Sequence, residues 1–273
     1  MSQSPRASPV IAAGWLDLVD ELDRWQEAGR AATLWWRDDD AVAPTRALER
    51  VVSIAGKVPI ALAVVPGTAQ PQLAGWLSHR AGSVPGTRIA VLQHGWRHSN
   101  HSGSTKKSEF PRERSSEDVA FELAAGRTRL TELFGKAALL VLAPPWNRFD
   151  NCFLPVLGRS GLSGISRAKP RRAPQPVPGV VEANVHVDLV AWAGSRGFIG
   201  EEAALSNLIA HLRARRLRLA CADEPTGILT HHLIQDEPTD RFLHRLLDVT
   251  ATHAAASWLE AGEIFVPVPL VAA

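Results

Sequence analysis

Apolar positions along this chain follow two spacings, one typical of amphipathic helices and the other of buried strands. Trp15, Leu22 and Trp25 share one face of the helical pattern in residues 11–27, whereas residues 60–65 form a continuous apolar run that ends at Pro-Gly. The helical spacing predicts helices over residues 11–27, 48–55, 72–79, 116–134, 152–159, 201–216 and 239–257. Strands are expected over residues 33–37, 60–65, 88–93, 138–142, 163–166, 185–189, 228–230 and 264–268.

The alternation of helix and strand predicts a parallel sheet with helices packed on its faces. About seven such units in 273 residues favour an α/β fold, a distorted (β/α) barrel of about seven parallel strands in a single domain. We expect residues 1–30 to form an N-terminal helix and residues 31–273 the barrel domain. Two long polar loops, residues 98–114 and 168–179, interrupt the rhythm, and the second, rich in Arg and Pro, is interpreted as a solvated connector.

Composition and charge narrow the class of protein. Apolar residues make up 45% of the chain and charged residues 21%, which is typical of a folded globular protein. The net charge of +2 is too small to favour nucleic acid or an anionic membrane as a partner. Two cysteines, Cys152 and Cys221, cannot make a disulfide framework, and neither a signal peptide nor a membrane-spanning apolar segment is visible. We therefore expect a cytoplasmic protein with no nucleic-acid or membrane partner.

Three aspartates, Asp38, Asp39 and Asp40, follow the first predicted strand with only Arg37 between. Neighbouring carboxylates repel one another, which costs little on an exposed loop and much near a core, unless a cation lies among them. A bound metal ion would compensate this charge. The alternative is a solvated acidic turn, which is the ordinary interpretation of an isolated Asp triplet.

Two histidines four positions apart, His94 and His98, follow the predicted strand 88–93. Together with a carboxylate from another strand they form a common three-ligand set for a catalytic divalent metal such as zinc. Gly95 follows His94, so the glutamate that a metalloprotease helix needs there is missing. His101 is the second candidate for the position of His98.

Three further predicted strands end in polar or aromatic residues, and the carboxyl ends of parallel barrel strands share one face. Histidine titrates near neutral pH, so His231 could donate a proton to a leaving amine. Asp188 could orient a catalytic histidine or cap a turn, and Trp146 could form a pocket wall. These residues are Trp146 with Asn147, Asp188 with the following Trp192, and the adjacent His231 and His232.

Taken in order, these motifs resemble those of the metal-dependent polysaccharide deacetylase family, over roughly residues 34–232. The resemblance implies a divalent metal cofactor, first of all zinc. It also implies roles for individual residues. Within the Asp triplet the pair of base and metal ligand is either Asp39 with Asp40, which is preferred, or Asp38 with Asp39. Under the preferred assignment the base is Asp39, the metal ligands are Asp40, His94 and His98, the general acid is His231, and the substrate contacts are Trp146, Asn147 and Asp188.

The sequence also departs from the family pattern. Ala143 occupies the place where the family has an Arg that orients the base, so Arg37, Arg148 or Arg167 would have to substitute. His232 stands where the family often has Asp. The implied activity is removal of an acyl group, first of all acetyl, from the amide nitrogen of an amino sugar or related small amide. The alternatives are hydrolysis of a non-sugar C–N bond on the same metal site, and a non-catalytic carbohydrate-binding module. The expected partner is a small-molecule or oligosaccharide substrate.

Overall fold

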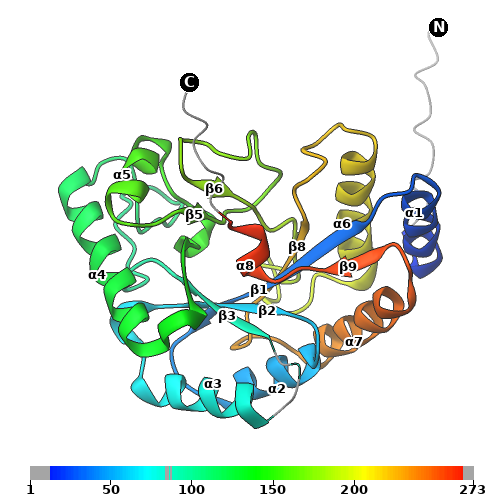
Figure 1. Cartoon of the computed structure of the whole chain (residues 1–273), viewed down its shortest axis with the longest axis horizontal. Helices are drawn as coiled ribbons and strands as arrows, with labels where there is room; N and C mark the ends of the chain where they lie inside the picture. The colour runs from blue at the N-terminus through cyan, green and yellow to red at the C-terminus, as the bar shows by residue number, and fades with distance from the viewer. Residues whose placement is uncertain (1–12, 84–85, 87, 267–273) are drawn as a thin grey trace, which may run out of the picture.

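A parallel sheet curled into a half-barrel forms the centre of the molecule, with helices around its outside (Figure 1). The computed structural model describes residues 13–83, 86 and 88–266. The strand order is β6-β5-β4-β3-β2-β1-β8-β7, and β9 pairs with the start of β1. All ladders are parallel, and within the described residues none joins β6 to β7. The predicted α/β fold, a distorted barrel in a single domain, is confirmed.

The elements alternate as the apolar spacing predicts. The strands are β1 (Ala32–Ala41), β2 (Ile60–Val64), β3 (Ile89–Gln93), β4 (Ala138–Leu142), β5 (Gly164–Ile165), β6 (Val181–Glu182), β7 (Val187–Asp188), β8 (Thr226–Thr230) and β9 (Ala256–Trp258). The α-helices are α1 (Trp15–Glu27), α2 (Arg46–Ala55), α3 (Pro71–Ser83), α4 (Ser116–Phe134), α5 (Leu154–Arg159), α6 (Glu201–Arg216), α7 (Glu237–Thr252) and α8 (Ala261–Ile264). Short 3₁₀ turns lie at Pro66–Thr68, Gly135–Ala137, Pro145–Asn147 and Asn151–Phe153.

Strand β1 lies in the middle of the sheet and is buried on both faces. Leu34 and Trp36 point outward and pack in the main core against the surrounding helices. Trp35 points into the barrel, where it packs with Ala61 and with Phe265, which follows α8. Side chains alternate between the two faces of a strand, so this pattern fixes which face each later residue of β1 can reach.

Helix α1 packs against the barrel through its apolar stripe. Leu18, Leu22 and Trp25 are buried in the main core, and Glu21 accepts hydrogen bonds from Arg216 of α6 at 2.7 and 2.9 Å. The separate boundary expected between residues 30 and 31 stays a prediction. Among the helices of the described residues, none is long and apolar enough to cross a membrane.

Several predicted elements were wrong in type or extent. The strand expected over 264–268 is wrong in its described part, because Ile264 ends helix α8; residues 267–268 lie outside the described residues, as do residues 11–12 of the first predicted helix. Helix α7 ends at Thr252, and residues 256–258, predicted to be mostly helix, instead form β9. Strand β1 runs to Ala41, so the three aspartates lie within the strand rather than after it.

Candidate metal centre and active site

The end of β1 directs its three carboxylates to different places. Arg37 and Asp39 are two residues apart and therefore share the inner face of the sheet, whereas Asp38 points to the outer side. The register between β1 and β2 shifts between Asp38 and Ala41, and Asp40 has a φ of 73°. Bulges of this kind redirect side chains next to functional sites. As a result, adjacent residues in the sequence have separate partners.

Asp40, His94 and His98 meet at one point from two different strand ends. Asp40 Oδ1 lies 3.1 Å from His94 Nε2 and 3.3 Å from His98 Nε2. Two ligand atoms of a tetrahedral zinc ion, each with a bond of about 2.0–2.1 Å, lie about 3.3 Å apart. The donor set and its spacing therefore fit a divalent cation of this kind.

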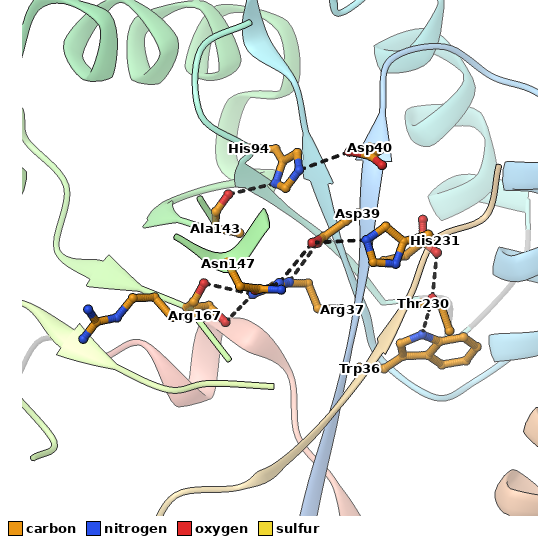
Figure 2. Close-up of polar contacts among 12 residues, drawn as sticks. Trp36, Arg37, Asp39, Asp40, His94, Ala143, Asn147, Arg167, Thr230 and His231 are labelled. Atoms are coloured by element: carbon orange, nitrogen blue, oxygen red, sulfur yellow. Dashed lines mark hydrogen bonds and ion pairs between the residues drawn. The ribbon is translucent and has the colours of Figure 1, made fainter. Parts of the chain in front are cut away.

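The backbone of Ala143 orients the first of these imidazoles. His94 is buried, and its Nδ1 lies 2.8 Å from the Ala143 carbonyl oxygen, as Figure 2 shows. A carbonyl only accepts, so Nδ1 carries a proton, and Nε2 is the nitrogen that faces Asp40 and could bind a cation. This is the outer contact that metal-ligating histidines usually have.

The electrostatics of this group favour a positive charge. Burial raises the pKa of Asp40, but the hydrogen bonds with His94 and His98 outweigh it and hold that pKa well below its usual range. Burial lowers the pKa of His94, but the charges of Asp39 and Asp40 outweigh it, so the pKa is raised. The first shift keeps Asp40 ionised, and the second reports negative potential from Asp39 and Asp40 around His94, which a cation would neutralise.

A buried glutamate, Glu109, holds the loop between the two histidines. Its carboxylate accepts backbone N–H groups of Trp96, Arg97 and Ser99 at 3.2, 2.8 and 3.3 Å. Gly95 has a φ of 62°, and a Cβ there would overlap Glu109 Oε2. The sequence prediction missed Glu109, because a single acidic residue in a polar loop carries no periodic signal. Its only sequence signal is its place in the long loop that follows the histidine pair.

His101, the alternative to His98, lies elsewhere in the same loop. Its side chain is exposed, and its backbone N–H donates to the Ser108 carbonyl at 2.9 Å. The structure therefore brings His98, rather than His101, to Asp40 and His94.

Arg37 holds Asp39 in a fully buried ion pair. Its Nε and Nη2 donate to the two oxygens of Asp39 at 2.8 and 3.0 Å, and Nη2 also donates to Asn147 Oδ1 at 2.5 Å (Figure 2). Nη1 donates to the carbonyl and hydroxyl oxygens of Ser166 at 2.9 and 2.8 Å. These five hydrogen bonds use all five N–H donors and fix the guanidinium in one orientation, and its pairing with Asp39 is the bidentate geometry by which arginine recognises a carboxylate.

Of the three arginines considered as substitutes at Ala143, Arg37 is the one in contact with Asp39. Arg167 pairs with Glu182 at 2.7 Å, and the exposed Arg148 donates to the Lys107 carbonyl at 2.7 Å. Ala143 is buried in the barrel interior, on the face where Arg37 lies.

Asp38 is engaged on the outer face of the sheet. It accepts from Thr230 Oγ1 at 2.6 Å and from His232 Nδ1 at 2.6 Å, and Thr230 in turn accepts from Trp36 Nε1 at 2.9 Å. Burial lowers the pKa of His232, but the charge of Asp38 outweighs it and raises that pKa. Asp38 and His232 thus form a buried ion pair that joins β1 to the end of β8. Asp38 is therefore not directed toward His94 and His98.

His231 lies near Asp39 Oδ2, the carboxylate oxygen that also accepts from Arg37 Nη2. Its Nε2 is 4.0 Å from Asp39 Oδ2, and the edge of Trp192 packs against its ring at 4.8 Å between centroids. Asp188 accepts from Trp192 Nε1 at 2.7 Å and from the Val190 N–H at 3.1 Å, so it supports Trp192 and closes a turn. Burial raises the pKa of Asp188.

Trp146 and Asn147 lie next to His98 and Arg37, and both have a φ near 57°. The Trp146 ring meets His98 edge-on at 4.3 Å between centroids, and Asn147 reaches Arg37. All eight residues selected from the sequence therefore lie at the same end of the barrel.

A second group of ligand types, His186, His211 and Glu224, lies near the start of β8. Here the Gly227 N–H donates to His186 Nδ1 at 2.9 Å, so the proton of this imidazole resides on Nε2, 3.6 Å from Glu224 Oε2. A protonated Nε2 has no lone pair for a metal. The rings of His186 and His211 also stack at 3.4 Å, which directs their nitrogens side by side rather than to one point. We interpret this group as a buried hydrogen-bonding cluster.

The curled parallel sheet with helices around it is a fold shared with known structures. No protein-family model matches the sequence, and no curated protein matches it either. A crystal structure described as a candidate polysaccharide deacetylase from Mycobacterium smegmatis superposes with a TM-score of 0.60 at 14% identity, over 94% of this chain and 93% of that chain.

Two further structures agree. A family 4 carbohydrate esterase from Streptomyces lividans, solved with acetate, has a TM-score of 0.52 at 12% identity, over 87% of this chain and 97% of that chain. The T48 deacetylase, solved with substrate, has a TM-score of 0.51 at 12% identity, over 86% and 91%. The chain therefore has the fold of the polysaccharide deacetylases of carbohydrate esterase family 4, which confirms the resemblance seen in the sequence at the level of the fold.

Proposed function

We propose that this protein is a metal-dependent hydrolase that removes an acetyl group from the amide nitrogen of an amino sugar or related small amide. The observation that carries the proposal is the spacing of Asp40 Oδ1 from His94 Nε2 and His98 Nε2, 3.1 and 3.3 Å, beside Asp39 and His231. Zinc is the cation that this nitrogen and oxygen donor set suits best.

The chain's own residues divide the proton transfers between them. A cation held by Asp40, His94 and His98 would polarise the amide carbonyl and lower the pKa of a water molecule beside it. Asp39, fixed by Arg37, takes the proton of the attacking water, and His231 gives a proton to the departing nitrogen. Because Asp39 and His231 lie 4.0 Å apart at their closest atoms, base and acid face the same small volume.

Trp146 and Trp192 form walls on two sides of this volume, one against His98 and the other against His231. We propose that they enclose the acyl group and the sugar ring, since flat aromatic faces stack on such rings. Asn147 and Asp188 would act mainly by positioning Arg37 and Trp192. Cys152 and Cys221 are free thiols, which suits a reducing cytoplasm, the compartment we propose.

The fold, and the presence of Asp39 and His231 beside the proposed cation site, support the deacetylase over a non-catalytic binding module. Hydrolysis of a non-sugar C–N bond would use the same residues, and the same assay separates the two. The assay measures acetate released from an N-acetylglucosamine oligomer and from simple N-acetyl amides, by protein stripped of metal and then reloaded with zinc.

We expect acetate only from the reloaded protein, and more of it from the sugar. His98→Asn should remove zinc binding, whereas the control His101→Asn should keep both zinc and activity. Asp39→Asn should keep zinc and lose turnover. A protein that binds no divalent cation, or that loses as much activity with His101→Asn as with His98→Asn, would contradict the proposal.

A further inference from the structure

A cleft of about 1120 Å³ lies beside the proposed active site. The two long polar loops of the sequence form much of its wall, through residues 102–113 and 167–176. Asn147 lines the cleft and also accepts a hydrogen bond from Arg37, which holds Asp39. The wall of the cleft is therefore joined through Asn147 and Arg37 to Asp39, the base of the proposed reaction. Its volume exceeds the roughly 300–1,000 Å³ of small-molecule pockets.

Positive charge is concentrated in this cleft. The three anionic side chains that line it are Glu113, Asp150 and Glu182. The six cationic side chains that line it are Lys106, Arg112, Arg148, Arg167, Arg171 and Arg172. Six cations and three anions leave the lining at +3, whereas the whole chain carries only +2. The remainder of the chain is thus close to neutral, and the excess charge lies in the cleft.

Several of these cations lack an anionic partner in the protein. Glu182 is neutralised by Arg167, and Arg171 pairs with Asp223 at 2.9 Å. Arg148 donates to the Lys107 carbonyl and forms no ion pair with any residue that the structure describes. Lys106 and Arg172 are exposed and make no side-chain ion pair within residues 13–83, 86 and 88–266. A concave surface with unpaired charge of one sign attracts and holds ligands of the opposite charge.

From this cleft we infer that the substrate is an anionic glycan, an oligosaccharide in which the N-acetylated sugar is flanked by units carrying carboxylate or phosphate groups. The remaining polar lining, including Ser102, Ser108 and Asn151, suits hydroxyl groups, and Arg guanidinium groups match oxyanions in geometry. This inference rests on the proposed deacetylase function, since it places the anionic units next to the amide that the active site would hydrolyse.

The test uses the full-length, zinc-loaded protein and three N-acetylated tetrasaccharides: one neutral, one alternating with glucuronic acid, and one bearing a phosphate ester. We expect kcat/KM to be about 10-fold or more higher for at least one anionic substrate at low salt, and this preference to fall as salt is added. The two anionic substrates distinguish carboxylate from phosphate recognition. Equal kcat/KM for all three, unaffected by salt, would overturn the inference.

A charge-matched pair of variants separates the cleft from overall charge. The cleft variant replaces Lys106, Arg148 and Arg172 with Gln, and the control replaces three exposed cations far from the strand C-termini, Lys136, Arg213 and Arg218. The cleft variant should lose the preference for the anionic substrate about 10-fold, and the control should retain it. Equal effects of the two variants would refute the inference.

Binding of the same tetrasaccharides by calorimetry gives an answer that does not depend on turnover. Tighter binding of an anionic tetrasaccharide, weakened by the cleft variant, supports the inference even without product. Turnover of the neutral substrate with no anionic preference would defeat the inference alone, whereas acetate release from none of the substrates would defeat the proposed function.

Discussion

Replacing Arg37 with Met should destabilise the protein strongly, because it leaves a buried carboxylate without its cation. Arg37 is fully buried, and Asp39, its bidentate partner, is 2% exposed. Removing one member of a buried ion pair costs about 3–5 kcal/mol. At roughly 2–4 °C per kcal/mol for a chain of this size, the Tm should fall by about 6–20 °C.

The double variant Arg37→Met/Asp39→Asn distinguishes lost charge compensation from lost packing. It removes both charges, so it should recover at least about 2 kcal/mol relative to the sum of the two single variants. It should not recover turnover, since Asn cannot accept a proton from water. Arg37→Met alone should lower kcat/KM by roughly 100-fold, because a base that shifts by about 1 Å loses that much.

The measurement is guanidinium-induced unfolding at neutral pH, followed by Trp fluorescence, with a chelator present so that cation binding does not add to stability. Arg241→Met is the control, since Arg241 forms an exposed ion pair with Glu237 that should matter little. If Arg37→Met costs less than about 1 kcal/mol, or if the double variant equals the sum of the singles, the assigned role of Arg37 is wrong.

Three further predictions concern the loop that holds the histidines, the Asp triplet and the buried Glu224. Gly95→Ala should weaken zinc binding at least about 10-fold by calorimetry, because it forces the histidine loop apart, whereas Gly103→Ala, in open space, should have no effect. Asp40→Asn should weaken zinc binding about 100-fold or more. Asp38→Asn should lower the Tm and leave the zinc affinity within a few-fold of the unmodified protein. The reverse result would make Asp38 the metal ligand in place of Asp40. Burial raises the pKa of Glu224 from 4.5 to about 7, so the native state retains a proton that the unfolded state releases. The stability that this group contributes is present below about pH 4.5 and is lost as the pH rises to about 7, by at most about 3 kcal/mol. The free energy of unfolding, measured at about pH 5 and at about pH 8, should therefore fall less in Glu224→Gln than in the unmodified protein.

The fold could be predicted from the sequence because its strands are short, apolar and separated by amphipathic helices. The errors occur where local patterns are ambiguous. An apolar run near Ile264 has no clear period, and it forms helix α8, whose first turn is capped by Glu260 and Glu263. Strand β6 contains only Val181 and Glu182, too short for any pattern.

The residue types of the site and their place at strand ends could be predicted from the sequence. The separate roles of Asp38, Asp39 and Asp40 could not. These roles depend on the bulge after Asp38, the left-handed conformation of Asp40, and partners about 190 positions away, Thr230 and His232. The sequence of residues 38–40 does not indicate any of these three features. The same holds for Arg37, whose role follows from sharing the inner face of β1 with Asp39.

The two histidine groups show which contact decides whether such a cluster can take a metal. Each combines two imidazoles with a buried or half-buried carboxylate, so residue types alone would rank them equally. At His94 a carbonyl oxygen lies against Nδ1 and leaves Nε2 free to bind a cation, whereas at His186 a backbone N–H donates to Nδ1 and keeps the proton on Nε2. The hydrogen bond at Nδ1 therefore distinguishes a group that can bind a metal from one that cannot. By this argument a metal ion added to the apo protein should bind at the strand C-termini and leave His186, with its stacked neighbour, unaffected.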